Sequence, residues 1–377
     1  MVFSSIRVRG DRFACPCPLW TDSFTTCSAN CKFCFVKETE ENFKNFPVAE
    51  ATNLKTIEGA FAKAFSEKEY NDPVVVSIKN RLPLGVGSRC DPFQNEELKL
   101  EQTLKILKIA KDYNYPVIIN TKFSRVAMDK YLKILGELEN PTVIINLLNS
   151  DQQTSTRLEP EVSPQMDRWA ALEYLNHLGI RADLRIAPLL PDINDSEKRI
   201  KNGMRKAKKK GVKFVAVEYY HLRYPNIANV HFKEAGIEFE PIYNTVTKKG
   251  YFTKKAEIFS ESAKELGLKV AFPDWIEAPF SSDLEACCGT SDRYNYYKCT
   301  FQHALKLLEK GKLDWKSYVK SIDFFLEKDE EKMKELWRKK SIHWSLWDLD
   351  QVKIIEYDSE GLPIFKREDN KGGLNEW

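Results

Sequence analysis

The strongest constraint on the fold is an alternation of short apolar runs with amphipathic stretches along most of the first 275 residues. Runs rich in β-branched residues predict buried strands, and apolar residues repeated every three or four positions predict helices. The predicted strands lie at 18–24, 74–78, 82–92, 117–121, 142–148, 182–189, 213–219 and 268–272. The predicted helices lie at 56–70, 96–113, 126–138, 164–178, 195–210 and 254–267. Near-continuous apolar strands separated by such helices are typical of a parallel sheet covered by helices, so we expect a full or partial β/α barrel.

The alternation stops near residue 275, and a different kind of region follows. We therefore expect a barrel domain at 1–275 and a C-terminal α+β appendage at 276–377, which contains cysteines, helical stretches and a hairpin. The hairpin prediction rests on VKIIEY and LPIFKR, which flank Asp-Ser-Glu-Gly. The stretch 222–252 inside the barrel is less regular and reads as an insertion.

Composition is ordinary for a folded protein, with 42% hydrophobic and 30% charged residues among 377. No apolar run is long enough to cross a bilayer, and the segment MVFSSIRVRGDRF has no apolar core like that of a signal peptide. We expect a cytoplasmic protein without a membrane partner. Nine cysteines in clusters, in a reducing compartment, point to metal binding more than to disulfides.

Three of these cysteines lie on one short stretch, CSANCKFCF, at positions 27, 31 and 34. If residues 18–24 form the first strand, this stretch is a loop at its carboxyl end, where barrels of this kind collect their functional groups. Three thiolates can hold three irons of a 4Fe-4S cluster and leave the fourth iron open, whereas structural zinc normally has four protein ligands. A zinc site completed by a distant residue, such as His221 or Cys90, is the alternative.

The spacing CxxxCxxC, with an aromatic residue before the last cysteine, resembles the motif of the radical SAM superfamily. The matching residues are Cys27, Cys31 and Cys34, with Phe33 before the last. The resemblance implies a partial (β/α)6 barrel and a 4Fe-4S cluster whose open iron binds S-adenosylmethionine. It also implies reductive cleavage of that cofactor to a 5′-deoxyadenosyl radical, with Phe33 beside the adenine. A flavodoxin- or ferredoxin-type protein would be the electron donor.

Three further stretches resemble the spore photoproduct lyase group of this superfamily. They are GSRCDPFQNEE at 87–97, INTKFSRVAMDKYLKIL at 119–135, and the segment 157–195, which ends in RIAPLLPDIND. Relatives in that group carry a Ser-Asp-like turn after the second strand, a Thr-Lys-Ser-like strand end and an Arg-Ile-x-Pro-x-x-Pro-x-x-Asn-Asp segment. The resemblance therefore covers the barrel.

This resemblance implies roles for individual residues. Lys122 would bind the cofactor carboxylate, Ser88 and Asp91 its amino group, and Asn146 its ribose, while Arg185 would project toward substrate or cofactor. Each position also has a structural interpretation. Asp91, which precedes a proline, can cap the next helix, and Lys122 can be an ordinary charge at the end of a strand.

Two departures from the lyase concern hydrogen return to the product radical. The lyase has a tyrosine directly after the third cluster cysteine, where this chain has Phe35, which carries no phenolic hydrogen. The lyase cysteine on the second-strand loop aligns with Ser88, while Cys90 lies two residues further along. On an extended strand that is the same face, so Cys90 is a candidate catalytic thiol; otherwise it is a small buried side chain. These changes weaken thymine-lesion DNA repair and favour modification or rearrangement of a base.

Five cysteines remain outside the motif and its neighbour Cys90. They form two islands, one of Cys15 and Cys17 and one of Cys287, Cys288 and Cys299. If the islands meet in space, four thiolates would suffice for a second iron-sulfur cluster. A zinc site, a quenching thiol or buried cysteines without chemistry are the alternatives, because these spacings match no common cluster motif.

Partner signals are weaker. Residues 198–213 carry nine basic residues and no acid, which suits either a phosphate backbone or the solvated face of a helix. Two hypotheses follow for the chain. One is a radical SAM enzyme acting on a nucleic-acid base or nucleotide, and the other is a zinc-binding nucleic-acid adaptor without catalysis.

Overall fold

The computed structural model describes residues 5–8, 17, 19–34, 36, 49–70, 72–220, 222, 224–248, 250–273, 280–282, 288–290, 292–294, 312–314, 352–359, 361 and 363–367. Its main feature is an eight-stranded sheet in which the strands follow one another in chain order, β1 to β8. β1 (Ile6–Val8) is antiparallel to β2, and every later neighbour is parallel.

The parallel part of the sheet has seven strands, one more than the predicted six. They are β2 (Leu19–Thr21), β3 (Leu84–Val86), β4 (Val117–Thr121), β5 (Thr142–Leu147), β6 (Arg181–Leu189), β7 (Phe214–Tyr219) and β8 (Lys269–Ala271). Among the described strands β1 and β8 are edges that pair with one neighbour each, so the sheet is an open barrel. The predicted partial β/α barrel is confirmed.

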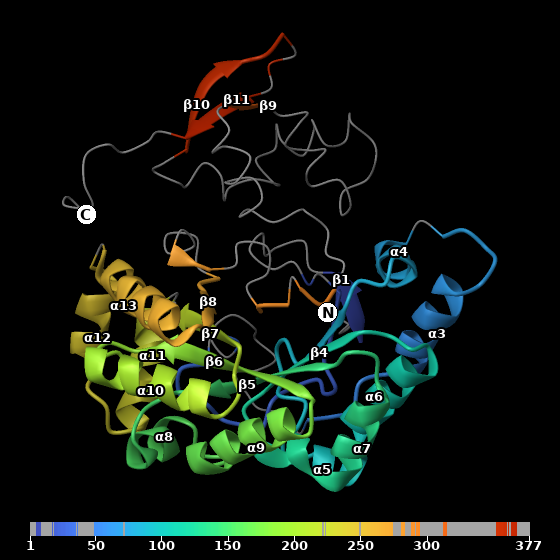
Figure 1. The fold of residues 1–377 in the computed structure, drawn as a ribbon, viewed down its shortest axis with the longest axis horizontal. Coiled ribbons are helices and arrows are strands. Elements are labelled where there is room, and N and C mark those ends of the chain that lie inside the picture. The colour runs from blue at the N-terminus through green and yellow to red at the C-terminus, as the bar shows by residue number, and fades with distance from the viewer. Residues whose placement is uncertain are drawn as a thin grey trace.

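Helices form an outer layer around these strands (Figure 1). They are α3 (Leu54–Ala64), α4 (Pro73–Lys79), α5 (Glu97–Leu100), α6 (Gln102–Asp112), η1 (Ser124–Ala127), α7 (Asp129–Glu137), α8 (Gln152–Leu158), α9 (Gln165–His177), α10 (Glu197–Lys209), α11 (Pro225–Glu234), α12 (Phe239–Val246) and α13 (Tyr251–Leu266). The main core lies between the helices and one face of the sheet, where Val143, Ile145 and Leu147 of β5 are fully buried. Alternate residues such as Ile144 and Asn146 face the barrel interior.

Three local predictions were wrong. Residues 74–78, predicted as a strand, are helical in α4, because Asp72 caps the backbone N–H groups of Val74 and Val75 and Pro73 suits the first turn. The insertion at 222–252 is regular and contains α11 and α12.

The single helix predicted at 96–113 is instead two, because the chain turns at Glu101, whose φ is 49°. The buried carboxylate of Glu97 lies over the start of α6. It accepts hydrogen bonds from the backbone N–H of Thr103 at 2.8 Å and from the hydroxyl of Tyr131 at 2.8 Å. A side chain thus satisfies donors that an unbroken helix would have bonded internally.

The amino end of the barrel interior is apolar and includes part of the C-terminal region. Trp20, Ile118 and Ile144 form one buried cluster with Cys17 and Cys288. Nearby, Arg181 donates to the carbonyl of Gly289 at 2.5 Å and to the carboxylate of Asp292 at 2.9 Å. Residues 288–290 and 292–294 therefore pack against the amino ends of the parallel strands.

A second, separate sheet belongs to the C-terminal region. β10 (Val352–Tyr357) pairs antiparallel with β11 (Pro363–Arg367), which confirms the predicted hairpin, and β9 (Lys312–Asp314) adds a third strand to β11. Most of the predicted helical part of this region lies outside the described residues. None of the described helices is long and apolar enough to span a membrane.

Candidate radical SAM site

The three-cysteine loop leaves the carboxyl end of β2 and is held from both sides. The backbone N–H of Lys32 donates to the carbonyl of Leu158 at 2.9 Å, and the backbone N–H of Ser28 donates to Gln94 at 2.5 Å. Cys31 is buried, while Cys27 and Cys34 are partly buried against the core. The thiols of the predicted cluster site therefore face the protein interior from one anchored loop.

The electrostatics of the loop suit a cationic group. Burial and the carboxylate of Asp91 raise the pKa of Cys27 to about 12. Burial raises the pKa of Cys31 well above its usual value, although Lys122 opposes the shift. The raised pKa values of Cys27 and Cys31 favour protonated thiols, and a cluster of iron ions would hold them as thiolates. The soft donor set fits such a cluster.

A site for a single metal ion needs several ligands that converge on one point. Within the described residues, no group of three or more His, Cys, Asp or Glu side chains lies close enough to hold one ion. Each thiolate of a cubane binds its own iron, so the three sulfurs need not converge on one point.

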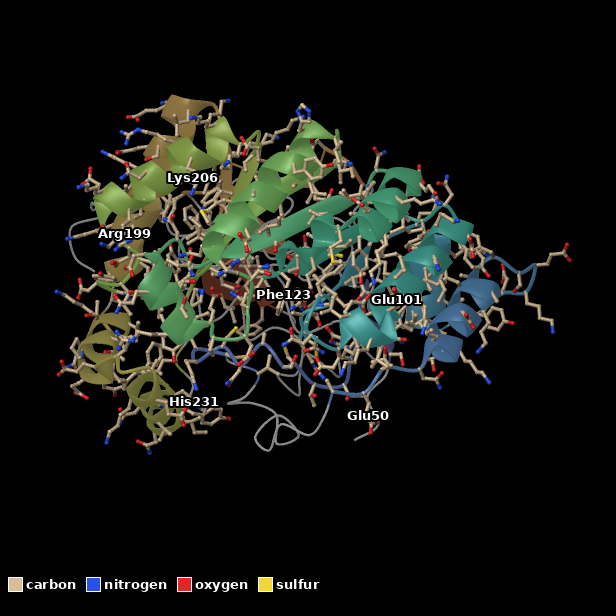
Figure 2. All side chains as sticks on the ribbon, turned by 90° about the horizontal axis from the view of Figure 1, so that it is seen from below. Glu50, Glu101, Phe123, Arg199, Lys206 and His231 are labelled. Atoms are coloured by element: carbon tan, nitrogen blue, oxygen red, sulfur yellow. The ribbon has the colours of Figure 1, made fainter. Side chains whose placement is uncertain are left out.

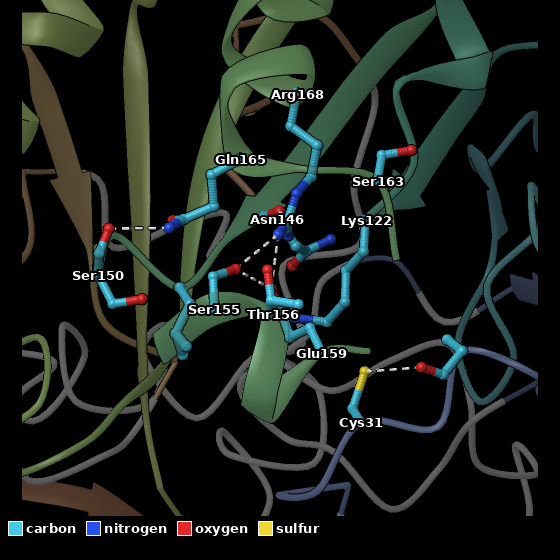
Figure 3. Close-up of polar contacts among 12 residues, drawn as sticks. Cys31, Lys122, Asn146, Ser150, Ser155, Thr156, Glu159, Ser163, Gln165 and Arg168 are labelled. Carbon is cyan, nitrogen blue, oxygen red and sulfur yellow. Dashed lines mark hydrogen bonds and ion pairs between the residues drawn. The ribbon is translucent and has the colours of Figure 1, made fainter. Parts of the chain in front are cut away.

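Lys122, predicted to bind the cofactor carboxylate, reaches from the end of β4 toward this loop (Figure 3). Its Nζ lies 5.1 Å from the centre of the Phe33 ring, 2.8 Å from Glu159 and 3.1 Å from the carbonyl of Ala187. An ammonium group has three N–H donors, and these two acceptors occupy two of them. Among the described residues the third N–H has no acceptor, so it can bind a ligand beside the cluster loop.

Glu159 was not found by sequence reasoning. Its carboxylate is fully buried, with Arg168 at 2.6 Å and Lys122 at 2.8 Å. Burial alone would raise the pKa of Glu159, but the charges of Arg168 and Lys122 outweigh it and lower the pKa to about 2. Arg168 also donates to the carbonyl of Asn146 at 2.9 Å (Figure 3). No local pattern identifies such a residue, because its partners lie on other elements.

Asp91, predicted to bind the cofactor amino group, has its carboxylate engaged within the protein. It accepts from the Thr121 hydroxyl at 2.7 Å and from the backbone N–H of Lys122 at 2.6 Å and of Phe93 at 3.0 Å. Its own N–H donates to the Cys27 sulfur at 3.4 Å. The structure thus brings Asp91 beside the cluster loop and ties that loop to the end of β4.

Ser88, the other predicted amino-group ligand, lies in a network around Asp22, a second residue that sequence reasoning missed. The buried carboxylate of Asp22 accepts from the backbone N–H groups of Ser88 at 2.7 Å and Arg89 at 2.9 Å, and from Arg7 at 2.5 Å. Burial would raise the pKa of Asp22, but Arg7 and the backbone of Arg89 outweigh it and lower the pKa. Asp22 therefore shapes the loop after β3.

Cys90, the candidate catalytic thiol, is buried in a small cluster with Val36, packed against Cys27 and Cys34. β3 ends at Val86 and residues 88–90 are a bend, so the extended strand that would place Cys90 on the face of Ser88 does not reach it. The structure brings a fourth thiol to the cluster loop rather than placing it by strand alternation.

Asn146 and Arg185 lie opposite each other in the β5–β6 ladder, on the interior face. The Asn146 amide donates to the carbonyl of Thr121 at 3.2 Å. The Arg185 guanidinium pairs with Glu218 of β7 at 2.5 Å, an acid that the sequence analysis did not single out. Alternation along each strand could have identified it, because Ala216 and Glu218 share the interior face.

The other predicted positions are only partly described. Of the two cysteine islands, Cys17 and Cys288 fall in one cluster at the amino end of the barrel, where Cys17 donates to the carbonyl of Pro83 at 3.2 Å. Cys15, Cys287 and Cys299 lie outside the described residues, as do Phe35 and His221. The proximity of the islands is therefore seen for one cysteine from each.

The basic run at 198–213 forms most of α10 on the outside of the barrel (Figure 2). Arg199 pairs with Asp151 at 3.1 Å, and Lys201 pairs with Glu197 at 2.6 Å. Lys206 lies 4.7 Å from the centre of the Trp169 ring. These contacts are those of a solvated helix face.

Comparison with known proteins bears on the fold. No protein-family model matches the sequence, and no curated protein matches it. Solved structures of similar fold include a radical SAM enzyme with a TM-score above 0.5. The chain thus has the fold of that enzyme.

Spore photoproduct lyase, solved as a cysteine-to-serine variant, is similar with a TM-score of 0.56 and 12% identity, over 72% of this chain and 80% of that one. SuiB of Streptococcus suis, bound to S-adenosylmethionine, has a TM-score of 0.44 and 15% identity, over 67% of this chain and 49% of that one. The chain thus spans about half the length of SuiB.

Proposed function

We propose that this protein is a radical SAM enzyme that takes a hydrogen atom from a nucleic-acid base or nucleotide and so starts a modification or rearrangement. One observation carries the proposal. Cys27, Cys31 and Cys34 lie on one anchored loop, with Lys122 Nζ 5.1 Å from the Phe33 ring beside them. Soft donors for a cluster and a cation for a carboxylate thus meet at the carboxyl end of the barrel.

In this proposal the three thiols hold a 4Fe-4S cluster. Bound together, the cluster and S-adenosylmethionine supply a 5′-deoxyadenosyl radical after one-electron reduction. Lys122 orients the cofactor carboxylate with its third N–H. Glu159 and the Ala187 carbonyl hold the ammonium group of Lys122 in place. Asp91 joins the cluster loop to β4 through Thr121. Preorganised groups of this kind lower the cost of orienting a reactive ligand.

The substrate class rests on two supports. The stretches at 87–97, 119–135 and 157–195 resemble the spore photoproduct lyase group, whose namesake repairs a DNA lesion. The interior face also presents polar side chains suited to a polar heterocycle, among them Arg185 and Glu218. Phe35 in place of a tyrosine argues for a reaction other than lesion repair.

The proposal predicts that anaerobically purified protein is brown, carries iron and sulfide, and converts S-adenosylmethionine to 5′-deoxyadenosine when reduced. The Cys31→Ala variant should lose the cluster absorbance and at least about a thousandfold of this activity, because one of three iron ligands is gone. Absorbance, iron analysis and chromatography of the nucleoside product measure both effects.

Ser262→Ala is the control, because it removes a small buried side-chain group on α13, away from every cysteine. It should keep the cluster absorbance and the nucleoside product. A colourless protein with stoichiometric zinc would overturn the proposal and support the adaptor alternative. Full 5′-deoxyadenosine formation by Cys31→Ala would contradict the assignment of the cluster loop.

A further inference from the structure

The interior face of the barrel changes character along the strands. Near the amino ends it is apolar, with Trp20, Ile118 and Ile144 packed together. Two residues further along β4 and β5 the same face turns polar. The polar positions are Asn120 on β4, Lys122 directly after β4, Asn146 on β5, Arg185 on β6 and Glu218 on β7. Period-two alternation places all of them inside the barrel.

Asn120 differs from the other members of this polar set. Its Oδ1 is buried and accepts no hydrogen bond from any described residue. The Asn146 amide, one strand away, donates to Thr121, and Arg185 pairs with Glu218. A buried amide oxygen without a donor costs free energy, so native proteins rarely keep one without a reason. A ligand that donates a hydrogen bond would remove this cost.

The neighbouring strand contributes no side chains at this point. β3 carries Gly85 in its middle, and Gly87 follows directly after it. A Cβ at Gly87 would lie 2.6 Å from the backbone oxygen of Asn120, and one at Gly85 would meet the Trp20 ring at 2.5 Å. The two glycines therefore let the Trp20 ring and the Asn120 backbone pack closely against β3.

We propose that Asn120 determines substrate specificity by hydrogen-bonding the polar edge of the substrate base. This inference rests on the proposed function. A side-chain amide presents a donor beside an acceptor, which is complementary to a heterocycle edge with an N–H beside an acceptor atom. Arg185 and Glu218, on the same interior face, supply a further donor and acceptor for the same ligand.

The adenine of the cofactor also has an edge with hydrogen-bond donors and acceptors. The ligand of Asn120 is therefore either this adenine or the substrate base. Asn120 lies two residues before Lys122 on β4, nearer the apolar amino end and further from the cluster loop with Phe33. A ligand that reaches Asn120 extends past the Lys122 ammonium into the barrel. We therefore assign the edge to the substrate base.

The test replaces Asn120 by leucine in the cluster-containing protein with S-adenosylmethionine present. Binding of short single-stranded homopolymers of deoxythymidylate, deoxycytidylate and deoxyadenylate is measured by fluorescence anisotropy. Unmodified protein should prefer one base, and Asn120→Leu should lose roughly tenfold to a hundredfold of that preference. Affinity for S-adenosylmethionine, measured by calorimetry, should change less than about twofold.

Thermal unfolding provides a second readout. Asn120→Leu should unfold at the same or a higher temperature, because it removes an unsatisfied buried oxygen. Asn146→Leu, the matched control, breaks an existing hydrogen bond and should unfold at a lower temperature. A fall for Asn120→Leu equal to that of Asn146→Leu, with base preference unchanged, would assign a structural role instead.

Two other results overturn the inference. If unmodified protein prefers no base, or Asn120→Leu keeps the preference, Asn120 does not determine specificity. If the variant loses affinity for S-adenosylmethionine instead, the ligand edge is the adenine of the cofactor. Failure of the proposed function shows up separately, as absence of 5′-deoxyadenosine from the unmodified protein.

Discussion

At the scale of single residues, the fully buried carboxylate of Glu159 shows how surroundings decide a role. Lys122 and Arg168 contact its two oxygens, and Ser155 lies 3.3 Å from one of them. The negative charge of Glu159 also contributes to the raised pKa of Cys31. A buried carboxylate is tolerated when both of its cationic partners are present. Removal of the carboxylate would leave the charges of Lys122 and Arg168 uncompensated. Glu159 therefore supports the Lys122 ammonium as well as the fold.

The lowered pKa of Glu159 predicts a defined loss of stability in acid. Its folded-state pKa is about 2, below the ordinary value of 4.5. The contribution is therefore complete above about pH 4.5 and declines as the pH falls toward 2. The difference in free energy of unfolding between unmodified protein and Glu159→Gln should be on the order of 3 kcal/mol at pH 7 and shrink below pH 4.5. Urea titrations across this range measure it.

Glu234→Gln is the control for this comparison. Glu234 pairs with Lys32 at 2.9 Å, but half of its side chain is exposed. An exposed pair contributes about 0–1 kcal/mol, so this variant should differ little from unmodified protein. A difference for Glu159→Gln that does not change with pH would contradict the assigned role of its charge.

At the scale of elements, α4 shows where local sequence misleads. The run Val74–Ile78 has the β-branched composition of a strand, yet it is a helix that starts after Asp72. The capping side chain and Pro73 favour a helix start, and the neighbouring β3 already pairs on both sides with β2 and β4. The run therefore has no place beside β3, and the capping side chain favours the helix.

Asp72→Ala should lower the free energy of unfolding by about 1 kcal/mol, because two backbone N–H groups of α4 lose their acceptor. Urea unfolding monitored by circular dichroism measures the change. Asp112→Ala is the control: Asp112 ends α6, where an acid is unfavourable to the helix dipole. That variant should be neutral or slightly more stable, and an equal loss in both would refute the capping role.

At the scale of the whole molecule, residues beyond 275 take part in the barrel. Tyr294 donates to the carbonyl of Val117 at 3.2 Å, and Arg181 holds Gly289 and Asp292. Gly289 has a φ of +65°, and a Cβ there would lie 2.0 Å from the Phe214 ring. This close approach allows the segment to cover the amino ends of the strands.

Gly289→Ala should therefore destabilise the protein by about 2–4 kcal/mol, since it adds an overlap with Phe214 to left-handed backbone strain. Thermal unfolding and limited proteolysis after residue 275 report the loss. Gly361→Ala is the matched control, with φ +73° and no atom within 4 Å of the added Cβ. It should cost only the backbone strain, about 1–2 kcal/mol. Equal effects of the two variants would show that contact with Phe214 is unimportant.

The sequence alone determined the barrel strands from β4 onward, the loop that carries the three cysteines, and the hairpin of β10 and β11. Periodicity and motif spacing are local properties, and a parallel sheet with outer helices is the arrangement that buries such apolar runs. The role of Lys122 was predicted from the resemblance to the spore photoproduct lyase group, and it stays a prediction.

Only the tertiary structure decided the environment of the site. Contacts between residues that are distant in sequence define this environment. They are the ion pairs of Glu159, the Asp22 network around the loop after β3, and the packing of Cys90 against the cluster loop. The Asn120 oxygen, which has no donor among the described residues, also depends on these surroundings. Burial and hydrogen-bond satisfaction depend on which strands become neighbours and which faces meet. A local pattern contains no information about those contacts, and they set the charge, the pKa and the unmet hydrogen bond from which the function is inferred.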